Sequence, residues 1–302
     1  MRIFVTGATG ALGGHAVPAL IEAGHEVTAL ARTPEKAAAL TAQGATAVTV
    51  SLFDRAALAE AFTGHDAVAN LASAIPPMSR FLSSRAWADC AKVRTEGSAA
   101  VAGAALDAGV GRVVQESVSM LYRDHGARWI EEDHPIDHYP LARSNIAAET
   151  SANGFTEAGR TGVVLRFGWF YGPGAAHAEQ MLAQARHHVV TQLGPSGSYV
   201  SSIHMADAGR AVAAALHAPA GTYNVVDDEP LTKREYADAL AEAAGVRVWF
   251  RGPGRAALLL GDRLTSLTRS IRVSNAKFRG ATGWAPEFPS AREGWWATAL
   301  SR

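Results

Sequence analysis

The stretch MRIFVTGATGALG, residues 1–13, runs from a short apolar segment into a glycine-rich turn. The apolar segment, residues 3–5, predicts a buried β-strand. The sequence after the turn predicts a helix, because apolar residues recur on one helical face at Leu12, Val17, Leu20 and Ile21. A strand that leads through such a turn into a helix is the local structure that binds the pyrophosphate of a dinucleotide.

Each of the three glycines has a distinct purpose in this turn. Gly7 permits the sharp bend off the strand, Gly10 lets backbone N–H groups approach a phosphate, and Gly13 lets the helix pack close to the sheet. The unpaired N–H groups at the start of the helix then face the anion. We therefore predict that a dinucleotide contacts the turn at Gly7, Thr9, Gly10, Ala11, Leu12 and Gly13.

The composition favours a small-molecule partner. The chain has 302 residues, its formal net charge is zero, and it has no dense basic run, so we expect neither nucleic acid nor a membrane as partner. The single cysteine, Cys90, excludes an internal disulfide. Because the first strand begins at residue 2, it leaves no room for a secretory signal, and we expect a cytoplasmic location.

Strand-like and helix-like segments alternate through the first half of the chain, which predicts an α/β fold with a Rossmann-type, doubly wound parallel sheet. The further strands are expected at residues 26–31, 47–50, 67–71, 112–116, 162–167 and 222–226. We assign residues 1–168 to a dinucleotide-binding core, to which residues 203–226 return. Residues 169–202 and 227–302 are richer in Pro, Gly and aromatic residues, so we assign them to a smaller C-terminal substrate lobe.

Several motifs along nearly the whole chain resemble those of the extended, or atypical, short-chain dehydrogenase/reductase superfamily, which contains NAD-dependent sugar epimerases and dehydratases. The motifs are the loop TGATGALG at residues 6–13, Asn70-Leu71-Ala72, RFGWFYGPG at residues 166–174, His204-Met205-Ala206-Asp207 and Tyr223-Asn224-Val225. The resemblance implies a Rossmann core that binds NAD(P) and a C-terminal substrate lobe. It also implies that Leu71, Ala72 and Phe167 lie beside the cofactor.

The end of the second strand favours NADP over NAD, although NAD stays possible. An NAD-binding chain usually has a carboxylate there, about twenty residues past the glycines, to bind the ribose hydroxyls. This chain has Arg32, whose planar, charged guanidinium suits a 2′-phosphate. Ser51 and Leu52 stand where the superfamily has an Asp-Leu pair at the adenine, so we expect them to contact that base.

The proton-transfer residues of the superfamily are a tyrosine and a lysine four residues later, and the resemblance leaves two alignments open. In the first, Leu141 stands at the tyrosine position and Asn145 at the lysine position, where Asn145 is expected to contact the cofactor. In the second, Tyr139 pairs with Arg143 at the same spacing. We favour the first, because Pro140 suits the first turn of a helix and so predicts Tyr139 at its N-cap.

The hydroxyl that polarises the reacting carbonyl is also displaced. In VQESVSMLY, residues 114–122, Val118 stands at its position and Ser117 and Ser119 flank it. Arg94 likewise stands where the superfamily has asparagine. The candidate catalytic residues are therefore Ser117, Ser119, Tyr139 and Arg143. The segment 131–138 has acidic residues and histidines but lacks the spacing of a metal site, so we expect a solvated loop and no metal.

Three functions remain open for a chain whose residues at the catalytic positions differ from those of the superfamily. The first is an NAD(P)-binding epimerase/dehydratase-like oxidoreductase that acts on a small metabolite, with Tyr139 as proton donor. The second is a non-catalytic sensor or regulator that binds NADP(H). The third is a non-redox lyase or isomerase that reuses the cleft. A homodimer is common in the superfamily and is possible here.

Overall fold

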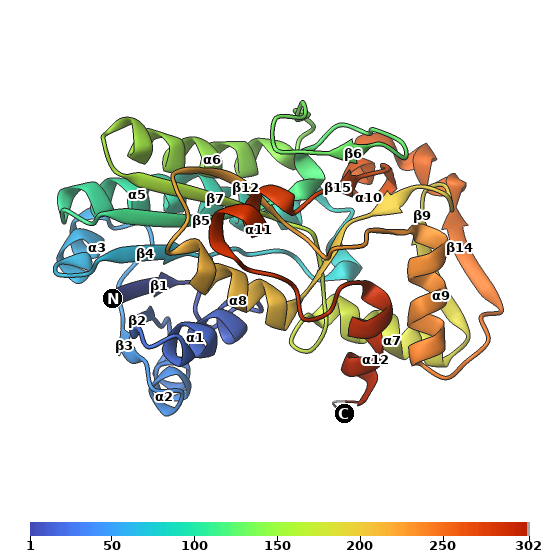
Figure 1. The fold of residues 1–302 in the computed structure, drawn as a ribbon, viewed down its shortest axis with the longest axis horizontal. Helices are drawn as coiled ribbons and strands as arrows, with labels where there is room; N and C mark the ends of the chain where they lie inside the picture. The colour runs from blue at the N-terminus through green and yellow to red at the C-terminus, as the bar shows by residue number, and fades with distance from the viewer. Residues whose placement is uncertain (301–302) are drawn as a thin grey trace.

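The computed structural model describes residues 1–300, apart from the side chains of Met78 and Arg263, and its centre is a seven-stranded sheet (Figure 1). The strand order is β12-β7-β5-β4-β1-β2-β3, and every neighbouring pair is parallel. The strands are β1 (Arg2–Thr6), β2 (Glu26–Leu30), β3 (Thr46–Val48), β4 (Ala67–Asn70), β5 (Arg112–Val118), β7 (Thr161–Phe167) and β12 (Gly221–Val225). The predicted Rossmann-type sheet is confirmed.

Helices cover both faces of this sheet, so its central strands are buried on both faces (Figure 1). One face carries α1 (Gly13–Glu22), α2 (Pro34–Ala42) and α8 (Met205–Ala215). The other face carries α3 (Arg55–Phe62), α5 (Ser98–Asp107) and α6 (Ala142–Glu157). α6 begins two residues later than Pro140 predicts, since residues 139–142 form a turn in which Ala142 N donates to Tyr139 O.

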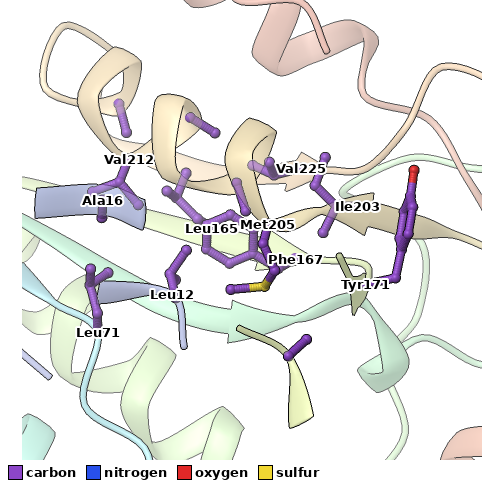
Figure 2. Close-up of a cluster of buried hydrophobic side chains, with 14 of the residues drawn as sticks. Leu12, Ala16, Leu71, Leu165, Phe167, Tyr171, Ile203, Met205, Val212 and Val225 are labelled. Carbon is purple, nitrogen blue, oxygen red and sulfur yellow. The ribbon is translucent and has the colours of Figure 1, made fainter. Parts of the chain in front are cut away.

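The largest buried cluster lies between the sheet and α8 (Figure 2). Leu165 and Phe167 of β7 and Val225 of β12 pack there with Met205 and Val212 of α8. Leu12 and Leu71 lie at the end of the cluster that faces the glycine turn (Figure 2), so packing of the core and placement of the turn are linked.

The C-terminal region is built from helices and short strand pairs at the carboxyl end of the sheet (Figure 1). Its helices are α7 (Ala176–Arg186), α9 (Lys233–Ala243), α10 (Thr265–Thr268), α11 (Ala276–Thr282) and α12 (Ala291–Leu300). Its strand pairs are β8 (Trp169–Tyr171) with β11 (Ser202–His204), β9 (Val189–Leu193) with β14 (Phe250–Gly254), β10 (Tyr199–Val200) with β13 (Leu231–Thr232), and β6 (Trp129–Ile130) with β15 (Arg272–Val273). Within residues 1–300, no helix has the length and apolar character needed to cross a membrane.

Candidate active site

In the glycine turn between β1 and α1, the backbone packs so tightly that neither Gly7 nor Gly13 has room for a side chain. Gly7 has φ of 69°, and a Cβ at this residue would lie 2.5 Å from the backbone of Leu71 at the end of β4. A Cβ on Gly13 would lie 2.3 Å from the carbonyl oxygen of Gly7. Gly10 N donates a 2.9 Å hydrogen bond to that same Gly7 oxygen. Strand, turn and helix therefore approach one another as the cofactor motif requires.

A cavity of about 490 Å³, here called the outer cavity, opens over this turn. Most of the predicted cofactor residues line it: Gly7, Thr9, Gly10, Ala11, Leu12, Arg32, Leu52, Leu71, Ala72 and Asn145. The start of α1 lies at its floor, where the positive end of a helix favours a phosphate. The structure thus brings these residues together around one space of the size that ligand sites have.

Three predicted cofactor residues are not part of its lining. Gly13 acts through packing, since its missing side chain lets α1 reach Gly7. Ser51 is exposed, and its Oγ accepts a hydrogen bond from Phe53 N. Phe167 is fully buried in the cluster beside α8 (Figure 2), so its side chain lies on the face of the sheet that this helix covers. The side chains of Ser51 and Phe167 thus lie outside the outer cavity, and their contact with the cofactor stays a prediction.

The two open alignments of the tyrosine and lysine positions differ in what they place at the outer cavity. Leu141 and Asn145, from the first alignment, both line it. Asn145 Nδ2 donates to Leu141 O at 3.1 Å, whereas its Oδ1 is buried without a hydrogen-bond partner among the described residues. Arg143 is exposed and lines neither this cavity nor its neighbour. An orphaned acceptor on a buried side chain is a feature that a bound hydroxyl donor would satisfy.

Tyr139 also reaches the outer cavity, although its partner Arg143 does not. The Tyr139 hydroxyl donates a 2.9 Å hydrogen bond to Met120 O. Burial raises the pKa of Tyr139 to about 12, while the charge of Arg269, which lies over the ring, opposes the rise. The phenol therefore stays protonated at neutral pH, and in this structure its proton is donated to Met120 O.

The two candidate serines have different surroundings. Ser117 is fully buried in β5, donates a 2.6 Å hydrogen bond to Glu149 Oε1, and lines neither cavity. Glu149 also binds Arg166 through two hydrogen bonds, so Ser117 belongs to a buried polar network between β5, α6 and β7. Ser119 follows the end of β5 and lines the neighbouring cavity, where it can meet a substrate.

A buried ion pair forms part of the outer cavity wall, and sequence reasoning did not foresee it. Arg94 Nη2 donates to both carboxylate oxygens of Glu116, at 2.9 and 3.0 Å, and both side chains are only 4% exposed. Arg94 lies in a π-helical turn, Val93–Gly97, a distortion that often occurs at functional sites. Its Nε has no partner among the described residues. Burial raises the pKa of the Glu116 carboxyl, and the Arg94 charge opposes that rise.

A second, smaller cavity of about 160 Å³, here called the inner cavity, adjoins the outer one. The residues lining both cavities are Met120, Trp169, His177, Gln180, Ser266 and Leu267. The inner cavity extends from this junction between α7, β9 and the start of α9. The site therefore has a compartment over the glycine turn and a separate compartment in the C-terminal region.

A family model described as the NAD dependent epimerase/dehydratase family matches residues 3–226, which include the glycine turn and every strand of the central sheet. The chain belongs to this family. A nicotinamide dinucleotide suits the family and the outer cavity. Gly7 and Gly10 line this cavity without side chains, and the orphaned Asn145 Oδ1 is an acceptor that a dinucleotide can engage. The resemblance to epimerases and dehydratases is confirmed.

Two relatives of this family member carry reductase names. It is 32% identical to a 3-diazoavenalumate denitrifying reductase of Streptomyces sp, over 97% of this chain and 99% of the relative. It is 28% identical to a 4-hydroxy-2-methyl-3-oxo-4-farnesyl-3,4-dihydroquinoline-1-oxide ketoreductase of Stigmatella aurantiaca, over 87% of this chain and 80% of the relative. The fold is also that of a human epimerase family protein solved with NADPH, with a TM-score of 0.84, 23% identity and all of both chains covered.

The buried pair gives the first prediction. Replacing Glu116 with Gln leaves the Arg94 cation buried without a counter-charge, so we expect the free energy of unfolding to fall by about 3–5 kcal/mol. Urea unfolding followed by tryptophan fluorescence measures this. The double variant Arg94→Met, Glu116→Met removes both charges and is expected to recover most of the loss. A Glu116→Gln protein as stable as the wild type would contradict the importance of this pair.

Proposed function

We propose that this family member is an NADP(H)-dependent reductase of a small aromatic compound. One observation carries the proposal: a cavity of about 490 Å³ over the glycine turn shares part of its lining with a second cavity that has aromatic walls. Trp169 contributes to both, and Tyr199 and Tyr236 line the inner one. The names of the two relatives, a denitrifying reductase and a ketoreductase, support a reductive reaction.

The outer cavity is the proposed site of the dinucleotide. The backbone of residues 7–12 and the start of α1 would hold the pyrophosphate, and Leu71 and Ala72 would border it. Asn145 Oδ1 would accept a hydrogen bond from a ribose hydroxyl, in place of the usual lysine ammonium. When bound in its reduced form, the nicotinamide supplies a hydride.

A side chain of the protein then has to supply a proton. When a carbonyl carbon accepts the hydride, its oxygen requires a proton to give the alcohol. Tyr139 is the proposed donor, because its phenol is protonated and borders the outer cavity close to Met120 at the junction. Ser119, on the inner side of that junction, is proposed to hydrogen-bond the carbonyl oxygen and polarise it.

A second candidate function is an NADP(H)-binding sensor without turnover. It is favoured by one observation, the presence of Leu141 and Asn145 where the superfamily has its tyrosine and lysine. Leucine has no proton to give and asparagine carries no charge. Turnover separates this function from the reductase, since both bind the cofactor and only the reductase oxidises it.

The choice of NADP over NAD is proposed from Arg32. Its side chain is exposed at the rim of the outer cavity and has no ion-pair partner within the described part of the chain. No carboxylate stands at the end of β2, in residues 31–34, to repel a 2′-phosphate. The guanidinium is therefore free to bind that phosphate through paired N–H groups.

Replacing Arg32 with Ala tests this choice of cofactor. We expect the dissociation constant for NADPH to rise about 10-fold to 100-fold, as for loss of a hydrogen bond to a charged group. The constant for NADH should change less than about threefold, because NADH lacks the phosphate that Arg32 would bind. Titration calorimetry with both nucleotides measures this, with Lys36→Ala as control, since Lys36 is on α2 but outside the cavity. Equal weakening of both nucleotides would refute the phosphate role.

Replacing Tyr139 with Phe tests the reductase proposal. The assay follows NADPH oxidation with cinnamaldehyde, benzaldehyde and acetophenone as probes. We expect the wild type to reduce at least one probe and Tyr139→Phe to lower kcat by about 10²-fold to 10⁴-fold. Tyr223→Phe is the matched control, because the Tyr223 hydroxyl also donates to a backbone carbonyl, Pro219 O, but lies outside both cavities. NADPH binding without oxidation of any probe would favour the sensor, and unchanged kcat in Tyr139→Phe would remove Tyr139 from the mechanism.

A further inference from the structure

The inner cavity has a marked imbalance of charge. Lys233 and Arg269 both line it, and neither Asp nor Glu is among its lining residues. Arg269 is already neutralised, since it pairs with Asp137 and also donates to Tyr122 O. Lys233 is therefore the cation in this wall whose charge the protein does not balance.

Lys233 is the first residue of α9 and is only 8% exposed. Its Nζ donates one hydrogen bond, 2.8 Å long, to Leu267 O. An ammonium has three N–H groups, so two remain without a protein acceptor among the described residues. No carboxylate of the described residues lies within ion-pair distance of Nζ.

Two physical effects make this placement unfavourable in the absence of an anion. Burial lowers the pKa of Lys233 to about 8, and the charge of Asp124 raises it only in part. Asp124 itself accepts hydrogen bonds from Gly126 N and Ser270 N. The start of a helix also disfavours a cation, because the helix dipole is positive there. An anion in the cavity would relieve both effects at once.

The rest of the wall suits a flat apolar group. Trp169, Tyr199 and Tyr236 contribute aromatic surface, and Met181 and Ile271 contribute aliphatic surface. An aromatic ring packs well against such a wall.

Two further polar side chains in this wall, Gln192 and His177, differ in whether they have a hydrogen-bonding group left for a ligand. Gln192 is 8% exposed, and its amide has no hydrogen-bond partner among the described side chains and backbone. His177 Nε2 donates a 2.6 Å hydrogen bond to Phe170 O, and burial lowers the pKa of the imidazole, so His177 adds no charge. Gln192 is thus available to a ligand, whereas His177 is committed to the backbone.

We propose that the inner cavity binds an aromatic carboxylate, with the carboxylate on Lys233 Nζ and the ring against the aromatic wall. This inference rests on the proposed reductase, whose substrate class it specifies. Gln192 is a candidate for a second hydrogen bond to the ligand, because it lines the same cavity with a free amide. The substrate thus differs from a neutral ketone or aldehyde by one negative charge.

The test compares cinnamate with cinnamamide, which has the same ring and chain but no charge. Titration calorimetry on the full chain, with and without NADPH, gives both dissociation constants. We expect cinnamate to bind about 10-fold to 100-fold more tightly than cinnamamide, as for a hydrogen bond to a charged group. The preference should vanish in Lys233→Met, whose apolar side chain fills the same space, and in Lys233→Gln. Lys277→Met is the control, because Lys277 is exposed and outside the cavity.

The pH dependence of cinnamate binding is a second readout, and a lysine with a purely structural role would not affect it. The affinity of the wild type for cinnamate should fall as the pH rises through about 8, since Lys233 then loses its proton, and the fall should be absent in Lys233→Met. The other ionisable groups around it are Asp124, Arg269, His177, Tyr199 and Tyr236, and all of them remain in the variant.

The outcomes separate this inference from the proposed function. Equal binding of cinnamate and cinnamamide by the wild type, or a preference that survives in Lys233→Met, would overturn the inference even if neutral carbonyl probes are reduced. A Lys233-dependent preference for cinnamate, without oxidation of NADPH by any probe, would support the inference and contradict the reductase.

Discussion

The whole site depends on the close approach of three backbone segments at the glycine turn. Gly7 lies against the backbone of Leu71, and Gly13 lies against the carbonyl of Gly7, at distances that exclude any side chain. This contact joins β1, β4 and α1 and leaves the start of the helix at the floor of the outer cavity. A Cβ at either glycine would separate these elements, and the cavity would lose both its shape and its phosphate-binding N–H groups.

The side chains at the outer cavity include residues from both open alignments. Leu141 and Asn145 line it, and Tyr139 reaches it from the turn before α6. Two buried arginine–carboxylate pairs, Arg94 with Glu116 and Arg166 with Glu149, hold the adjoining strand ends and helices. In each pair, the opposite charge offsets the free-energy cost of burying a charge inside the protein. Lys233, a buried cation without an ion-pair partner among the described residues, lines the inner cavity.

The sequence was sufficient to predict the sheet and most of the outer cavity, since glycine spacing and apolar strands are local properties. It does not determine where each side chain points. Phe167 belongs to the motif at residues 166–174, and its position in β7 turns the ring towards α8 (Figure 2). Ser51 follows the end of β3 and is exposed outside the outer cavity, whereas Leu52 lines it. Glu116 and Lys233 matter because of contacts between segments that are distant in sequence. The sequence contains one hint of these contacts, an acidic residue, Glu116, within a predicted buried strand.

The central claim is that the glycine turn and the end of β4 hold a nicotinamide dinucleotide. Hydrogen–deuterium exchange of the purified protein, with and without saturating NADPH, tests it most directly, because it reports on individual backbone segments. The account predicts that NADPH slows exchange in peptides covering residues 7–14 and 71–75, and leaves α11 and α12 unchanged. Unaltered exchange at residues 7–14, with protection confined to other segments or absent throughout, would contradict it.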